Sequence, residues 1–318
     1  MRRFFAICLI SALALVSCAG GGSKSAPENI DFPMVRVPGM VGDGADGLEY
    51  LHSHYWDEFL SLDGPCDTAG ILGVRKGDVA KALSNYISLS ENVPLEFAQD
   101  NIRKFFLALE TKQAEDTSSR FFRLMTEMVS LYLYDPNSPL RNEDLYLPFV
   151  RCAAVSEYTR EDMRPAYQYE AEACALNQQG HYVPDFKIRD INGRVFTLYS
   201  VKAEYTMLFF SNPDCGDCKN IISQVMGREY VEREIEAGRL AVVNVYIDED
   251  VRAWRKYEKN YPRSWRNGYD PKFVIRKDEL YNVRAIPSLY LLDSGKRVIM
   301  KDAPTEKVMR YLDNIFAR

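Results

Sequence analysis

The chain has 318 residues, 47% of them hydrophobic, and a formal net charge of -5. This composition is typical of a folded protein, and the mild acidity argues against the basic surface that nucleic-acid binding requires. The length exceeds that of one typical domain, so we expect two folded domains.

The first residues have the pattern of a bacterial export signal. Met1-Arg2-Arg3 is basic, and the apolar run 4–16 is too short for a permanent membrane span. Small residues then precede Cys18, an arrangement that resembles the lipobox of bacterial lipoproteins. The resemblance implies a signal peptide over residues 1–17 and lipid attachment to Cys18; a plain signal peptide with an incidental cysteine is the alternative.

Residues 18–45 begin with a stretch rich in glycine and small polar residues, which predicts a flexible tether. No later run is apolar and long enough to span a bilayer. We therefore expect a lipid-anchored protein of the cell envelope that faces the periplasm, with the gram-negative outer membrane as the favoured location.

Residues 46–180 show apolar residues at helical spacing and no strand alternation, which predicts a helical domain. The expected helices cover 47–62, 78–90, a segment from residue 94, 118–134, 143–156 and 165–178. His52 and His54 are two residues apart and cannot share a helix face, so surface or capping roles are expected and a metal pair is not.

Three cysteines of the chain, Cys66, Cys152 and Cys174, lie in or near these helices. An odd number in an oxidising compartment leaves at least one thiol free or paired between chains. Cys152 and Cys174 fall on successive predicted helices, which leaves a bridge open, but we favour three unbridged thiols.

From about residue 181 the pattern changes to alternating strands and helices. Two short strands flank the Asn192-Gly193 turn and predict a hairpin. Further strands are expected at 205–211, 240–247, 286–292 and 297–300, and helices at 216–237, 250–260, 277–282 and 304–316. The first of these helices is expected to end at Gly238.

Cys215 and Cys218 follow the strand 205–211 and open the next helix. Their spacing stacks the two sulfurs on the first helical turn, where a helix N-terminus stabilises a thiolate. This pattern predicts a redox-active dithiol. Half of a zinc site and a pair that no longer cycles are the alternatives, but the sequence lacks a second Cys-x-x-Cys or a nearby histidine pair. We expect no metal and no cofactor.

The order of these elements, the Cys215-Gly216-Asp217-Cys218 motif and the Ile286-Pro287 pair together resemble the envelope thioredoxin-like oxidoreductases of the TlpA/ResA kind. The resemblance covers about residues 181–318. It implies a thioredoxin-like α/β fold, and hence an α+β two-domain chain in which an all-α bundle comes first. It also implies a cis bond before Pro287, with Ile286 and Pro287 forming the substrate groove; an ordinary proline at a strand start is the alternative.

Two carboxylates depart from the family pattern. Asp214 stands where Trp is usual, and Asp217 stands where Pro is usual. As tuning groups they would disfavour the thiolate and make the pair less oxidising, which favours a reductant or an isomerase. The alternative is that both point to water and stabilise only the helix N-terminus.

The family's buried acid would lie at Phe209 or Ile221, and neither residue is acidic. Proton transfer must then involve Asp214, Asp217, Lys219 or water.

The sequence thus predicts a membrane-anchored thiol-disulfide oxidoreductase in which Cys215 attacks and Cys218 resolves. The implied partners are disulfide-bearing envelope proteins and an upstream electron donor. The alternative is a redox-inert module of thioredoxin fold that binds a peptide or protein in the groove beside Pro287. Residues 46–180 resemble the helical domain of unknown function that precedes thioredoxin domains in some envelope lipoproteins, a resemblance that brings no activity.

Overall fold

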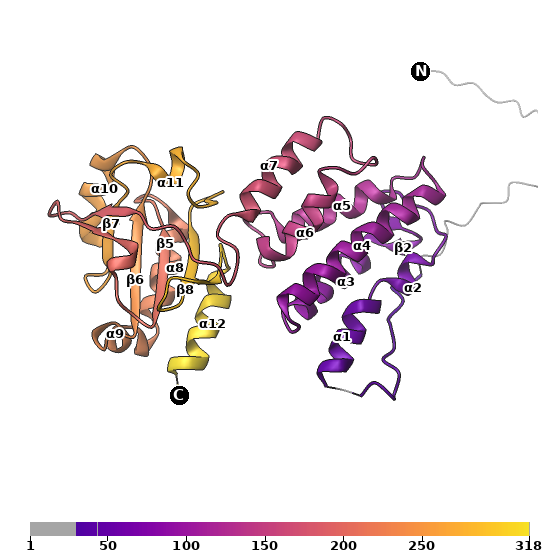
Figure 1. Cartoon of the computed structure of the whole chain (residues 1–318), viewed down its shortest axis with the longest axis horizontal. Helices are drawn as coiled ribbons and strands as arrows, with labels where there is room; N and C mark the ends of the chain where they lie inside the picture. Colours follow the sequence, from indigo (N-terminus) through magenta and orange to yellow (C-terminus); the bar gives the residue numbers. More distant parts are fainter. Residues whose placement is uncertain (1–29, 43, 318) are drawn as a thin grey trace, which may run out of the picture.

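The computed structural model describes residues 30–42 and 44–317, so Cys18 and the predicted signal peptide lie outside the described residues. The chain forms a helical half followed by an α/β half, and Figure 1 shows the two lying side by side. This arrangement confirms the predicted fold class. Within the described ranges, no helix has the length and apolar character needed to cross a membrane.

The helical half consists of helices whose apolar residues recur every three or four positions and face a common core. These helices are α1 (Ala45–His54), α2 (Asp57–Leu60), α3 (Lys76–Ser90), α4 (Leu95–Glu115), α5 (Phe121–Leu133), α6 (Glu143–Ala153) and α7 (Arg164–Ala175). The core is strongly aromatic: Trp56 stacks on Phe105, and Phe106 meets Phe149 edge to face. Such ring pairs add to the free energy gained from burial alone.

Two details of this half differ from the sequence prediction. The single helix expected over 47–62 is interrupted between α1 and α2. A small hairpin, β1 (Gly70–Ile71) and β2 (Val74–Arg75), also occurs where no strand was expected. Its turn residues Leu72 and Gly73 both have positive φ, which is the geometry of a tight two-residue hairpin turn.

The α/β half contains a seven-stranded sheet with the order β4-β3-β7-β6-β5-β8-β9. Its strands are β3 (Lys187–Arg189), β4 (Val195–Thr197), β5 (Tyr205–Phe210), β6 (Leu240–Tyr246), β7 (Arg266–Tyr269), β8 (Ser288–Leu292) and β9 (Val298–Met300). Strands β5, β6 and β7 run parallel, and β8 is antiparallel to β5. The helices are α8 (Gly216–Met226), α9 (Glu229–Glu236), α10 (Val251–Tyr257), α11 (Val274–Lys277) and α12 (Thr305–Phe316).

Strand β5 is buried on both faces, in keeping with its continuous apolar sequence. Met207 and Phe209 point to the face covered by α8, α9 and α12. Leu208 and Phe210 point to the opposite face, where residues of α11 and the segment after it pack. The strand therefore fixes the position of the loop that follows it, and this loop carries the two cysteines.

Three predictions for this half need correction. The helix expected over 216–237 divides into α8 and α9, because Gly227 ends the first helix and Arg228 is extended. The short helix expected over 277–282 lies earlier, as α11. Strand β7 was not expected, since its sequence has no apolar run, and it is held by pairing with β6 and β3.

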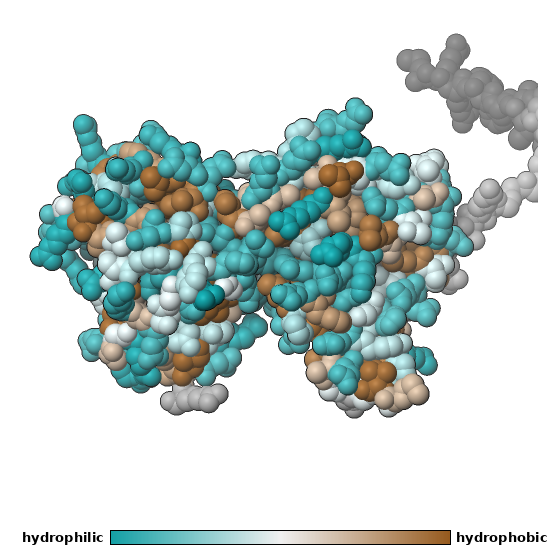
Figure 2. Space-filling view, in the orientation of Figure 1, coloured by the Kyte–Doolittle hydropathy of each residue, from teal (hydrophilic) through white to brown (hydrophobic). Residues whose placement is uncertain are grey.

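Figure 2 shows the two halves in contact, with a notch between them on the lower side of the view. Apolar side chains are scattered over the face shown rather than gathered in one patch. Most of the contacts join α6, α7 and the connecting segment to the segment 279–284 and residues 301–302. Further contacts come from Tyr134, which lies against Arg284, and from Glu91, which pairs with Lys307.

Candidate functional site

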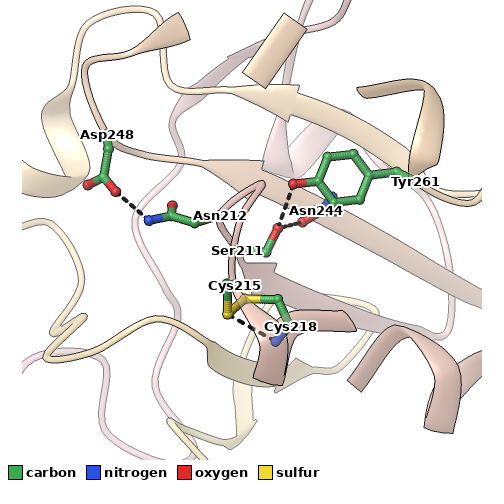
Figure 3. The surroundings of a disulfide bond; sticks show 7 residues. All are labelled: Ser211, Asn212, Cys215, Cys218, Asn244, Asp248 and Tyr261. Atoms are coloured by element: carbon green, nitrogen blue, oxygen red, sulfur yellow. Dashed lines mark hydrogen bonds between the residues drawn. A yellow bond between two sulfur atoms is a disulfide. The ribbon is translucent and has the colours of Figure 1, made fainter. Parts of the chain in front are cut away.

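The two cysteines form a disulfide at the N-terminus of α8, as Figure 3 shows. Cys215 is the N-cap residue, and its Sγ accepts a hydrogen bond of 3.0 Å from the backbone N–H of Cys218. Cys215 is half-buried, whereas Cys218 is only 1% exposed. A Cβ placed on Gly216 would meet no atom within 4 Å, so the space beside the disulfide is open.

The Ile286–Pro287 peptide bond is cis, as predicted. Ser288, the next residue, pairs with Phe210 at the end of β5. Ile286 packs against the same apolar cluster that contains Cys218 and the partly buried Cys215. The pairing of β8 with β5 thus brings the two sequence motifs, about 70 residues apart in the chain, to one edge of the sheet.

Asp214 and Asp217 are both exposed. Water screens exposed charges strongly, which favours the prediction that they point to solvent. Lys219 is also exposed, and its ammonium lies 5.7 Å from the centre of the Tyr257 ring. The tuning role of the two aspartates stays a prediction.

A neutral polar network lies beside the start of the cysteine loop (Figure 3). The hydroxyl of Ser211 donates to Oδ1 of Asn244 at 2.5 Å and lies 3.4 Å from the hydroxyl of Tyr261. Burial raises the pKa of Tyr261 to about 12, so its hydroxyl stays protonated. These groups are buried and hydrogen-bonded to one another, and none of them carries a charge. They lie near β5, the strand in which one of the two possible positions of the family's buried acid, Phe209, is found.

A charged network lies on the other side of the loop. The side-chain amide of Asn212 donates to Oδ2 of Asp248 at 2.7 Å, and Arg276 pairs with Oδ1 of the same carboxylate at 3.1 Å. Nη1 of Arg276 also donates to the carbonyl of Val283 at 3.3 Å. The residue three positions before Cys215 is thereby connected to the segment that leads into Pro287.

Sequence reasoning missed both networks, although two signals were present. Asn244 is a polar residue inside the apolar run of β6, which indicates a buried hydrogen bond. Asp248 follows the carboxyl end of β6, and the carboxyl ends of neighbouring parallel strands share one edge of a sheet. This rule would have placed Asp248 beside the cysteine loop.

A hollow of about 600 Å³ opens between the two halves. Its walls include Tyr134 and Tyr169 of the helical half, and Arg276, Val283 and Arg284 of the other. Because Arg276 also contacts Asp248, this hollow borders the edge that carries the disulfide. A larger hollow of about 870 Å³ lies near residues 238–242, at the opposite end of β6, and so has no connection with the cysteines.

The remaining candidates from the sequence are structural in character. His52 is buried and hydrogen-bonded to Ser90 at 2.9 Å, so the expected surface or capping role is wrong for it, whereas His54 is exposed and pairs with Asp57. Within the described ranges, no three His, Cys, Asp or Glu side chains are grouped as metal ligands.

The three other cysteines of the described chain, Cys66, Cys152 and Cys174, are unbridged, in agreement with the sequence prediction. Burial raises the pKa of the Cys174 thiol and, to a smaller extent, that of Cys152. Neither thiol therefore has the electropositive, accessible surroundings of a reactive cysteine.

Comparison with known proteins agrees with this fold. A family model described as "Domain of unknown function (DUF5106)" matches residues 16–174. The crystal structure of a thioredoxin-like protein from Bacteroides caccae is 32% identical and superimposes with a TM-score of 0.74; the match covers 88% of this chain and 97% of that one. The chain is a thioredoxin-like protein that carries a DUF5106 domain.

Two further matches concern the thioredoxin-like half. The thioredoxin-like protein YneN of Bacillus subtilis is 30% identical over 121 residues, which is 36% of this chain and 66%, just under two thirds, of that protein. The C-terminal domain of an uncharacterised protein from Bacteroides fragilis is 39% identical, with a TM-score of 0.41; the match covers 43% of this chain and 97% of that one.

Proposed function

We propose that this thioredoxin-like protein is a thiol-disulfide oxidoreductase that uses the Cys215–Cys218 pair. The observation that carries the proposal is the asymmetry of the pair: Cys215 is half-buried at the N-terminus of α8, and Cys218 is buried behind it. A helix N-terminus stabilises a thiolate, and the open space over Gly216 gives a substrate disulfide access to the outer sulfur.

The chemistry is two successive thiol-disulfide exchanges. In the reduced protein, the thiolate of Cys215 attacks one sulfur of a substrate disulfide; the substrate S–S bond breaks, and one substrate sulfur leaves as a thiolate. The thiolate of Cys218 then attacks Cys215, which releases the second substrate sulfur and leaves the Cys215–Cys218 disulfide. Two electrons have passed to the substrate, and an upstream dithiol donor must return two to the protein. Water beside the half-buried Cys215 can supply the protons.

The proposal extends to the setting predicted from the sequence. We place the protein in the cell envelope, anchored through a lipid on Cys18 and facing the periplasm, where disulfide-bearing proteins are its substrates. Ile286 and Pro287 form the groove that holds the substrate chain. The acidic neighbours Asp214 and Asp217 favour reduction or isomerisation over strong oxidation.

The test combines a redox titration with substrate trapping. Equilibration with a series of glutathione or dithiothreitol ratios, followed by alkylation and mass measurement, should show Cys215 and Cys218 gaining and losing two labels together. A Cys218→Ala variant should accumulate a mixed disulfide on Cys215. If the pair never opens in the folded protein and Cys218→Ala holds no partner, the proposal is wrong.

One observation favours a second candidate, a redox-inert module that binds a partner in the groove beside Pro287. The buried groups beside the cysteine loop, Ser211, Asn244 and Tyr261, are neutral, so an acid that would assist proton transfer to Cys218 is missing from this network. Reduction of insulin separates the two candidates: the oxidoreductase turns over with dithiothreitol as donor, whereas the binding module does not.

A further inference from the structure

Glu143, the first residue of α6, is the centre of a buried ionic cluster between the two halves. Its side chain is 1% exposed. Oε1 accepts a hydrogen bond from the amide of Asn282 at 2.9 Å and pairs with Nε of Arg284 at 3.0 Å. Oε2 pairs with Nζ of Lys301 at 3.0 Å. All three partners belong to the thioredoxin-like half.

Asp302 extends this cluster to the residue that follows Pro287. Nη2 of Arg284 lies 2.6 Å from Oδ2 of Asp302, and the other oxygen, Oδ1, accepts a hydrogen bond of 2.8 Å from the hydroxyl of Ser288. Arg284 lies three residues before Pro287, and Ser288 lies directly after it. The cluster therefore contacts the chain on both sides of the Ile286–Pro287 bond.

These contacts matter because the segment from Asp278 to Pro287 forms neither a helix nor a strand. Its position depends on side chains rather than on a backbone ladder. From the cysteine side it is contacted by Arg276, whose Nη1 donates to the carbonyl of Val283. From the other side it is contacted by Glu143 of the helical half, which binds Asn282 and Arg284.

Each carboxylate of the cluster is paired with cations. Glu143 and Asp302 face Arg284 and Lys301. Arg141 is a further cation at the edge of the cluster: its Nε donates to the carbonyl of Asp302 at 2.8 Å and lies 3.7 Å from Oδ2 of that residue. Burial raises the pKa of the Glu143 carboxyl, while the charges of Lys301 and Arg284 oppose that rise. A buried ion pair adds little net stability compared with apolar residues, but the removal of one partner leaves the others uncompensated. Loss of Glu143 would therefore leave Lys301 without its carboxylate partner and Arg284 with Asp302 alone.

We propose that Glu143 is a positioning residue for substrate recognition: through Asn282 and Arg284 it holds the segment before Pro287 in the shape that accepts a protein substrate. This inference rests on the proposed oxidoreductase function and assigns the helical half a part in it. It separates two properties of the protein. The affinity for a protein disulfide depends on Glu143, whereas the chemistry of Cys215 and Cys218 does not.

The experiment compares two disulfides in the full chain. Insulin is reduced with dithiothreitol as the electron donor, whereas the small disulfide is mixed with protein that has been reduced beforehand and freed of dithiothreitol, so that only the protein thiols can reduce it. Insulin is a protein disulfide and needs the groove, whereas 5,5′-dithiobis(2-nitrobenzoate) is a small disulfide that reaches Cys215 without it. For Glu143→Gln we expect the KM for insulin to rise about tenfold, equivalent to roughly 1.4 kcal/mol of lost binding. The rate with the small disulfide and the glutathione equilibrium of the Cys215–Cys218 pair should stay at the wild-type values.

The chain offers two matched controls. Asp144→Asn neutralises the neighbouring buried carboxylate, which accepts a hydrogen bond from the backbone N–H of Gln179 and not from the segment before Pro287. Glu234→Gln neutralises a buried acid on α9 that pairs with Arg233 and Arg239. Both controls should keep the wild-type KM for insulin. If Glu143→Gln does not fold, Asn282→Ala removes one hydrogen bond between the halves, leaves the ion pairs intact, and should raise the same KM.

The possible failures are distinguishable. A wild-type protein that reduces neither disulfide refutes the oxidoreductase function and this inference with it. If the wild-type protein is active, three results would overturn the positioning role alone. Glu143→Gln could keep the wild-type KM for insulin, it could slow the reduction of both disulfides equally, or it could change the KM for insulin by the same amount as Asp144→Asn.

Discussion

The guanidinium carbon of Arg284 lies 4.2 Å from the centre of the Tyr134 ring, so a cation of the thioredoxin-like half stacks on an aromatic residue of the helical half. The ring of Tyr134 also stacks on that of Tyr146, with the centroids 4.9 Å apart. Because the same guanidinium pairs with Glu143 and Asp302, this contact fixes the plane in which both ion pairs form.

We predict that Tyr134→Leu lowers the free energy of unfolding by about 1 kcal/mol, since it removes the aromatic face under Arg284. Tyr134→Phe keeps the ring and should be close to neutral. Urea unfolding followed by far-UV circular dichroism measures both. Equal losses for the two variants would mean that the hydroxyl, and not the ring, is the important group.

Acid should destabilise the helical half through His52. Burial lowers the pKa of His52 from 6.5 to about 4, so between these values the unfolded chain binds a proton that the folded chain excludes. The contribution of the neutral ring to the free energy of unfolding is fully present above about pH 6.5. It is lost as the pH falls toward 4, with a slope of up to about 1.4 kcal/mol per pH unit.

A His52→Phe variant tests this, because Ser90 keeps its hydrogen bond to the carbonyl of Tyr86 and remains satisfied. The variant should lose the part of the pH dependence that lies between about pH 6.5 and 4. Urea unfolding at a series of pH values gives the slope, and an unchanged slope in the variant would exclude His52 as its source.

Asp217→Asn should shift the redox potential of the dithiol upward, because a negative charge near the helix N-terminus disfavours the reduced, ionised form. The side chain is exposed, so the expected shift is at most on the order of 10 mV, against about 30 mV for a tenfold change in equilibrium constant. Glutathione equilibration of both proteins provides the measurement. A potential unchanged within error would show that the carboxylate acts only on the helix, or not at all.

A separate prediction concerns the lipid anchor. Cys18→Ser should abolish incorporation of radiolabelled palmitate and leave the protein uncleaved or released from the membrane fraction. Replacement of Cys66 by serine is the control and should leave labelling intact. Palmitate labelling that persists in Cys18→Ser would eliminate the lipoprotein assignment without affecting the redox chemistry.

The parts of this fold that follow local rules could be predicted from the sequence. The Asn192-Gly193 turn, the buried strands β5 and β6 and the end of a helix before Gly238 each depend on residues close together in the chain. Gly238 has a φ of +71°, the conformation that a helix-ending glycine supplies. The cysteine spacing was equally local, whereas the role of the Ile286-Pro287 pair was implied by the resemblance to a family. Together they point to the edge of the sheet that carries the candidate site.

Features that depend on distant partners could not be predicted. Strand β7 has the sequence Arg-Asn-Gly-Tyr, and its glycine is required by the sheet: a Cβ on Gly268 would lie 2.4 Å from Cγ2 of Ile188. The ionic cluster joins Glu143 to Arg284 and Lys301, residues separated by more than 130 positions. Neither the spacing nor the charge of these residues distinguishes them from the solvated residues around them.

The cluster around Glu143 also bears on dissection of the chain. A fragment that starts after α7 would retain the cysteines, Pro287 and the whole sheet, yet it would lack the carboxylate that neutralises Arg284 and Lys301. Arg284 would keep Asp302 as its partner, whereas Lys301 would lose its carboxylate partner and lie on new surface. Such a fragment would undergo thiol exchange and still misrepresent the selectivity of the intact protein, since the recognition segment would be missing one of its supports.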